Sequence, residues 1–208
     1  MFLNDLLNVF IQLLVFALIP FIFFLITRKK HRNFFNYIGL YRSTRKANML
    51  AFLIAIIILV GSLGIAMFSP EMKSVLDNPQ SVSGKFKDLG FSAQSVVLLL
   101  FFAWIKTALA EEIFFRGFLA KRMIASFGFV IGNGIQAFLF GLLHLVLFWK
   151  LIEDANAFFL TFIFLVSGLS AYLMCYLNEK HARGSILPGW LAHGTANMVT
   201  YAVIAYVM

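Results

Sequence analysis

The chain has 208 residues, of which 62% are hydrophobic and only 12% are charged, and its formal net charge is +8. Soluble domains have about 25% charged and about 45–50% apolar residues. The composition therefore excludes an ordinary soluble protein and indicates a membrane protein of one domain. No solvated basic segment of domain size is present, so the positive charge does not indicate nucleic-acid binding.

Six apolar segments are long enough to cross a bilayer, which requires about 20 mostly apolar residues. These segments are 6–27, 49–68, 93–114, 127–149, 155–177 and 186–207. The sequence therefore predicts an all-α fold, a polytopic membrane helical bundle of about six transmembrane helices. The first segment lacks a basic leader and ends on the stretch TRKKHR, so we expect it to remain as an anchor.

Charge in the connectors predicts the orientation. The connector 28–48 has seven Lys and Arg residues and no acidic residue, whereas the connector 69–92 has three acidic and three basic residues. The positive-inside rule places the first connector in the cytoplasm and the second, read as a loop, outside. The alternation then puts both termini outside.

Ionisable and amide side chains inside the predicted spans are candidates for function, because each costs free energy in the bilayer. The candidates are Lys106, Glu111, Glu112, Arg116, Asn133, Gln136, His144, His193 and Asn197.

The stretch EEIFFR contains two adjacent glutamates. Residues four apart share a helix face, so Glu112 and Arg116 can form an ion pair. Glu111 points about 140° away from Arg116 and is left as an additional carboxylate. The alternative is a structural salt bridge near the membrane surface. Lys106 also lies about 140° from Glu111, so we expect it to be packed or snorkelling.

Two further motifs place imidazoles in spans. In FGLLH, Phe140 and His144 are four apart, and Asn133 shares their face; in HGTAN, His193 and Asn197 are four apart. His144 alone is as consistent with an interhelical hydrogen bond as with catalysis, and an interhelical hydrogen bond is the alternative to a functional role for His193 and Asn197.

Together these side chains fit the hydrolysis of an amide. A carboxylate and an imidazole can activate water as general bases, and an imidazole and an amide can donate hydrogen bonds to an oxyanion. No two histidines lie four apart, which excludes an HExxH zinc motif. Cys175 is the only cysteine, which excludes an intramolecular disulfide.

The motifs Glu-Glu-x-x-x-Arg, Phe-x-x-x-His and His-x-x-x-Asn occur in this order, and the chain resembles the CPBP family (CAAX proteases and bacteriocin-processing enzymes, also called Abi) over about residues 95–205. The resemblance implies an intramembrane endopeptidase whose active site opens to the cytoplasm. It implies that Glu111 and His144 activate water and that His193 and Asn197 bind the oxyanion. The supporting residues are then Glu112, Arg116 and Phe140.

On this interpretation, residues 1–92 form two N-terminal transmembrane helices with a basic cytoplasmic connector and an external loop, and residues 93–208 form the catalytic core. We expect no cofactor, with zinc as the alternative. The expected partners are membrane lipid and a membrane-associated peptide or protein substrate, with no nucleic acid, and the expected location is a bacterial plasma membrane. The other functions considered are a non-catalytic scaffold or bacteriocin-immunity protein and a small transporter.

One geometric difficulty follows from the predicted spans. At about 1.5 Å per residue from the cytoplasmic loop, Glu111 lies about 15 Å and His144 about 25 Å into the membrane. Their contact requires a tilted or displaced fourth helix, and the glycines of GFVIGNG predict a break there. Because the loops are short, we also expect substrate selectivity to arise from a lateral opening between helices.

Overall fold

The computed structural model describes residues 2–27 and 33–207. Within these ranges the chain is 87% helical and has no strands, which confirms the all-α class. Four basic residues on which the orientation was partly based lie outside the described residues. They are Arg28, Lys29, Lys30 and Arg32.

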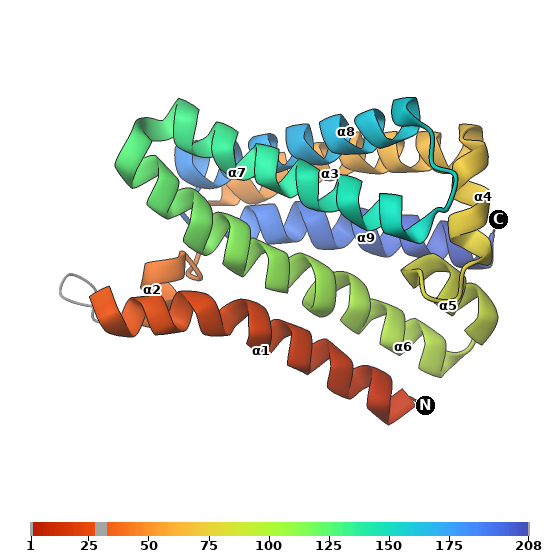
Figure 1. Ribbon diagram of the computed structural model, residues 1–208. Coiled ribbons are helices and arrows are strands. Elements are labelled where there is room, and N and C mark those ends of the chain that lie inside the picture. The colour runs from red at the N-terminus through yellow and green to blue at the C-terminus, as the bar shows by residue number, and fades with distance from the viewer. Residues whose placement is uncertain (1, 28–32, 208) are drawn as a thin grey trace.

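The helices pass back and forth between two ends of the bundle (Figure 1). Three stretches of the described chain are π-helical, with hydrogen bonds from residue i to i+5, and are labelled η. The elements are α1 (Phe2–Thr27), α2 (Phe34–Ile38), α3 (Arg45–Phe68), α4 (Pro70–Asp77), α5 (Val82–Leu89), α6 (Ala93–Phe101), η2 (Phe102–Leu109), η3 (Glu112–Ala120), α7 (Lys121–Leu151), α8 (Ala157–Tyr176), η4 (Leu177–His181) and α9 (Leu187–Tyr206).

Several helices begin at side chains suited to that position. The side chains of Thr44, Ser81, Ser92 and Asn156 each accept a hydrogen bond from a backbone N–H in the first turn of α3, α5, α6 and α8. Such caps satisfy backbone donors that have no partner within the helix. Local sequence therefore determines where these helices start.

Four stretches of the described chain are long and apolar enough to cross a membrane. They are Phe2–Thr27, Arg45–Ile65, Ala93–Leu151 and Ala157–His181. Apolar side chains on their outer faces are exposed, such as Leu14 at 67%, Val60 at 65% and Leu169 at 60%. Soluble proteins rarely expose so large an apolar area, whereas lipid covers it. The protein is thus a polytopic membrane bundle. Because α9 is not among the four stretches, the count of six crossings stays a prediction.

The stretch Ala93–Leu151 is 59 residues long and reverses its direction at Gly128. Gly128 has a φ of 76° and a ψ of 169°, a conformation that glycine adopts readily because it has no Cβ. Gly132 then lets the two legs touch, since a Cβ there would lie 2.4 Å from the backbone nitrogen of Ile124. The break predicted in GFVIGNG is confirmed.

This reversal removes the expected difference in depth. Glu111 lies 17 residues before Gly128 and His144 lies 16 residues after it. Two antiparallel legs of nearly equal length place both residues at a similar level in the bundle. The expected depth difference was wrong because the helix continues through Lys121 and Arg122, where the sequence analysis had placed a loop.

Residues 69–92 form two helices that fold over one end of the bundle, where the sequence predicted a loop. Figure 1 shows α4 and α5 at the end that also holds both termini. Phe86 of α5 is fully buried, and its ring packs edge-on against Phe102 at 5.4 Å between centroids. The apolar side chains of α4 and α5 thus pack on the bundle, which a pattern of turn residues did not predict.

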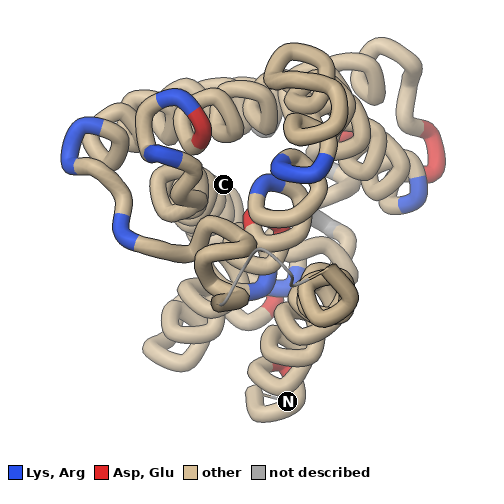
Figure 2. Tube along the Cα trace, turned by 90° about the vertical axis from the view of Figure 1, so that its left-hand side faces the viewer, with Lys and Arg blue, Asp and Glu red and all other residues tan. Residues whose placement is uncertain are grey.

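The opposite end of the bundle is rich in Lys and Arg (Figure 2). Lys121 contacts the Glu179 carboxylate at 2.8 Å and donates to the Gly184 carbonyl oxygen at 2.7 Å. The Tyr41 hydroxyl donates to the Arg183 carbonyl oxygen at 2.7 Å. Burial and the nearby Glu179 carboxylate raise the pKa of Tyr41, which therefore stays a neutral donor. These bonds tie both the N-terminal region and the start of α7 to η4 or to the segment that follows it.

We predict that Gly132→Ala destabilises the protein by about 1–3 kcal/mol, because the added methyl group would push the two legs apart. Gly134→Ala is the matched control on the same helix, since a Cβ there would meet nothing within 4 Å. Unfolding can be followed in detergent with a thiol-reactive dye, because Cys175 is buried. Equal melting temperatures for the two variants would contradict the close approach at Gly132.

Candidate active site

Glu111 and Glu112 lie where the π-helical stretches η2 and η3 meet. π-helical turns are rare and often occur at functional sites. The wider turn changes the helical phase assumed from the sequence, but the predicted ion pair forms. Glu112 Oε1 lies 3.3 Å from Arg116 Nη1.

The Glu112–Arg116 pair is fully enclosed. Glu112 is 0% and Arg116 1% exposed. The Arg116 guanidinium lies over the Phe140 ring, 4.3 Å from its centroid, which adds a cation–π contact. The pair therefore joins η3 to α7 inside the bundle, rather than forming a salt bridge at the membrane surface.

Gly189 at the start of α9 lies directly against Glu112. A Cβ at Gly189 would lie 2.6 Å from Glu112 Oε2, and the Gly189 N–H donates to Asn178 Oδ1 at 2.9 Å. Any larger residue at this position would displace either the carboxylate or the helix. The sequence analysis missed Gly189 and Asn178 because neither belongs to a recognised motif.

His193 lies between the two adjacent glutamates. Its Nδ1 is 3.4 Å from Glu112 Oε1, and its Nε2 is 3.8 Å from Glu111 Oε2. The Phe140 ring contacts the same imidazole edge-on, with 6.1 Å between centroids. The sequence analysis had paired Glu111 with His144, so the contact between Glu111 and His193 is a new finding.

His144 stacks on Phe140 as the four-residue spacing predicted, with 4.4 Å between ring centroids. Its Nδ1 lies 2.9 Å from the Phe140 carbonyl oxygen. Because a carbonyl oxygen only accepts, Nδ1 carries the proton in this hydrogen bond, and in the neutral ring Nε2 has the lone pair. This tautomer is suited to accept a proton at Nε2.

Asn197 is oriented by Thr107, a residue that the sequence analysis missed. Asn197 Nδ2 donates to Thr107 Oγ1 at 3.0 Å. The Thr107 hydroxyl donates in turn to a backbone carbonyl oxygen of η2. Its Oγ1 lies 3.0 Å from the carbonyl oxygen of Ala103. A side-chain amide has two N–H donors, so one N–H of Asn197 remains for a ligand. The signal in the sequence was that Thr107 lies four residues before Glu111.

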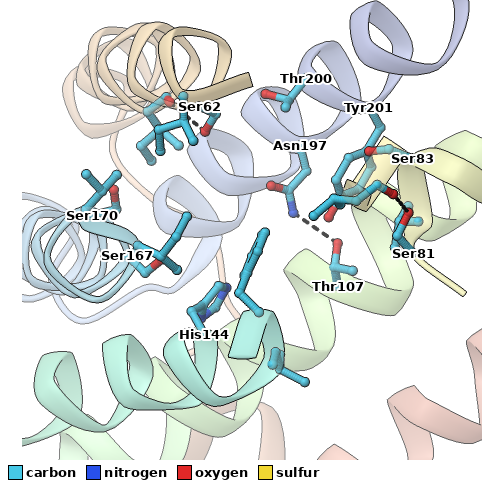
Figure 3. Close-up of a pocket in the computed structure, with 18 of the residues that line it drawn as sticks. Ser62, Ser81, Ser83, Thr107, His144, Ser167, Ser170, Asn197, Thr200 and Tyr201 are labelled. Atoms are coloured by element: carbon cyan, nitrogen blue, oxygen red, sulfur yellow. Dashed lines mark hydrogen bonds between the residues drawn. The ribbon is translucent and has the colours of Figure 1, made fainter. Parts of the chain in front are cut away.

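One cavity of about 420 Å³ brings the four predicted catalytic residues together. Its lining includes Glu111, His144, His193 and Asn197, whereas Glu112 and Arg116 lie behind the wall. Figure 3 shows His144 facing Asn197 and Thr107 across this space. From these residues the cavity extends toward α4 and α5, away from the basic end.

Three other polar candidates lie outside the cavity lining. Two of them donate to backbone carbonyl oxygens of α8. The Asn133 amide donates to that of Tyr172 at 3.1 Å, and the Gln136 amide donates to that of Ala171 at 3.2 Å. Asn133 therefore joins α7 to α8, and its amide does not line the cavity. Lys106 packs over the Phe102 ring at 4.2 Å, as expected for a non-catalytic lysine.

Zinc, the alternative to a cofactor-free site, would need a set of protein ligands. Catalytic zinc has three protein ligands, usually His, Glu, Asp or Cys. No group of three or more such residues within the described ranges is close enough to hold a metal ion.

A family model described as "Type II CAAX prenyl endopeptidase Rce1-like" matches residues 93–199, just over half of the 208 residues. No curated protein and no solved structure matches the chain. The match begins at the start of α6 and includes the four candidate residues. It confirms the resemblance to the CPBP family.

We predict that Arg116→Met destabilises the protein by about 3–5 kcal/mol, because it leaves the buried Glu112 carboxylate unpaired. The double variant Glu112→Gln/Arg116→Met should recover part of this loss, since it removes both charges. Melting temperatures read from the Cys175 thiol measure the effect. If the single and double variants melt together, the pair is not the contact that stabilises this region.

Proposed function

Because the chain belongs to the Rce1-like family of type II CAAX prenyl endopeptidases, we propose that it hydrolyses a peptide bond of a membrane-associated substrate with a water activated by Glu111 and His144. The observation that supports this proposal is that Glu111, His144, His193 and Asn197 line one cavity. In a membrane bundle, ionisable side chains around an enclosed space are expected at a functional site.

Glu111 and His144 are the proposed bases. Glu111 Oε2 is buried and has no hydrogen-bond partner among the described residues, so it is available to a water molecule. In this mechanism the water oxygen attacks the substrate carbonyl carbon while its proton passes to Glu111, and His144 Nε2 holds the water in line. The proton is then delivered to the leaving amine as the C–N bond breaks.

His193 and Asn197 are the proposed donors to the oxyanion of the tetrahedral intermediate. The N–H of Asn197 that Thr107 does not use is one donor. The other is His193 Nε2, when it carries a proton. Donors already held in place stabilise developing charge most effectively in a dry cavity, because they do not have to reorganise.

The family description makes a prenylated CAAX peptide one candidate substrate, provided that the host prenylates proteins. Leader peptides of secreted peptides are the other class that we considered. The proposed location remains the plasma membrane of a bacterium, with the basic end in the cytoplasm according to the positive-inside rule. The resemblance implies an active site that faces the cytoplasmic side, whereas the described cavity extends toward α4 and α5, at the end opposite the basic end.

Two other functions remain as alternatives. A non-catalytic scaffold or bacteriocin-immunity protein would keep the fold without needing the carboxylate of Glu111. A transporter would have discontinuous spans in matching halves, and the described helices show no such repeat.

We predict that Glu111→Gln lowers the rate of peptide cleavage by about 10²–10⁴-fold, because the amide cannot act as a general base. Purified protein and a panel of leader and prenyl peptides provide the measurement. Glu153→Gln is the matched control, since Glu153 is exposed and lies in the loop before α8. If the cellular phenotype persists in Glu111→Gln, the scaffold function is favoured instead.

We predict that a zinc chelator such as 1,10-phenanthroline leaves the cleavage rate unchanged within about twofold, because the proposed water is activated by side chains alone. The assay compares protein incubated with chelator, with chelator plus added zinc, and with buffer. Loss of activity that zinc restores would establish the zinc-dependent alternative.

A further inference from the structure

The helices α4 and α5, with the turn between them, form one wall of the cavity; we call residues 70–89 the cap. Six of its residues line the cavity, namely Met72, Val75, Gln80, Ser81, Val82 and Ser83. The cap lies outside the part of the chain that the family model matches, residues 93–199. Its contribution is therefore a property of this chain, not of the matched region.

Contacts at both helices hold the cap in place. Asn156, at the start of α8, donates to the Glu71 carboxylate of α4. Lys85 of α5 forms an ion pair with Asp5 of α1. The Ser69 hydroxyl also donates to Glu71 at 2.6 Å and lowers the pKa of that carboxyl, which therefore stays ionised at neutral pH. A wall fixed at several points can discriminate by size, because it does not yield to a larger ligand.

Among the described residues, the cavity leaves room on two sides of the catalytic residues. One side leads to α3 and α8, where Ser62, Ser167 and Ser170 line it, and the other leads to the cap. Behind the catalytic residues, Glu112, Arg116 and Asn178 are at most 1% exposed and fill the interior. The second side continues from Asn197 past Thr200 and Tyr201 to Ser83 (Figure 3). A substrate bound at the catalytic residues can therefore extend toward the cap on one side of the cleaved bond.

The lining of this space suits an uncharged peptide segment. No Lys or Arg is among the described residues that line it, and Glu111 is the one carboxylate. Hydroxyl groups are spread over the otherwise apolar wall, and Thr200 Oγ1 is buried without a hydrogen-bond partner among the described residues. Buried hydroxyls of this kind are normally satisfied, so Thr200 is suited to bond a peptide group of the substrate.

We propose that the cap is the element that selects the substrate, and that the small side chain of Ser83 sets the size of the uncharged residue accepted beside the cleaved bond. Ser83 is 6% exposed and faces the cavity. This inference rests on the proposed function and deepens it. It differs from the expectation that selectivity arises from a lateral opening between helices.

The test replaces Ser83 by a large residue and measures selectivity. A farnesylated CAAX peptide is prepared in three versions, with Ala, Leu or Phe directly after the cleaved bond. Ser83→Phe should lower kcat/KM for the Leu and Phe versions about tenfold or more relative to the Ala version. Asp88→Phe is the matched control, because Asp88 is exposed on the same helix, and it should leave the ratios unchanged. Unchanged ratios in Ser83→Phe would overturn the proposal.

A second version of the test avoids a folding defect. Ser83→Cys is made in a Cys175→Ala background and folds before it is changed. Methyl methanethiosulfonate then transfers its methylthio group to the thiol at position 83 and releases methanesulfinate. The same selective loss should appear on modification, and Asp88→Cys should show none. An equal loss for all three peptides, or no loss, contradicts the proposal. The proposed function has a separate readout. If the wild-type protein cleaves the peptides and Glu111→Gln does not, the proposed function holds even when the cap proposal fails.

Discussion

The buried ion pair between Glu112 and Arg116 is the contact on which the arrangement of the site depends. An isolated charge at membrane depth is costly, so each group needs the other. The pair, 3.3 Å apart, also receives the Phe140 ring on one side and His193 on the other. Because Glu112 is committed to these contacts, its neighbour Glu111 is the carboxylate that faces the cavity.

The reversal of the chain at Gly128 brings the second half of the site to the same level. Without it, His144 would lie deeper than Glu111, as the predicted spans had suggested. The π-helical turns around Glu111 also contribute to the site. They place Thr107 of η2 in hydrogen-bond contact with Asn197 of α9. Two local departures from an ordinary α-helix thus align three separate helices around one space.

The cavity is lined both by residues inside the region that the family model matches and by residues outside it. The candidate catalytic residues lie within the matched region, 93–199, whereas one wall is built from residues of α3 and the cap. On our proposals, the chemistry belongs to the family and the selectivity to the N-terminal region of this chain. On these proposals, α3 and the cap supply the selectivity within the same bundle that holds the candidate catalytic residues.

The sequence by itself determined the membrane class, most of the helices and the short-range contacts. Hydropathy and the i, i+4 spacing are local properties, so the Glu112–Arg116 pair and the stacking of His144 on Phe140 could be predicted. Only the tertiary structure decided that His193 is the imidazole next to Glu111, that Asn133 joins α8, and that residues 69–92 cover the cavity. These features depend on one glycine dihedral angle and on contacts between residues far apart in the chain, and no local pattern encodes such contacts.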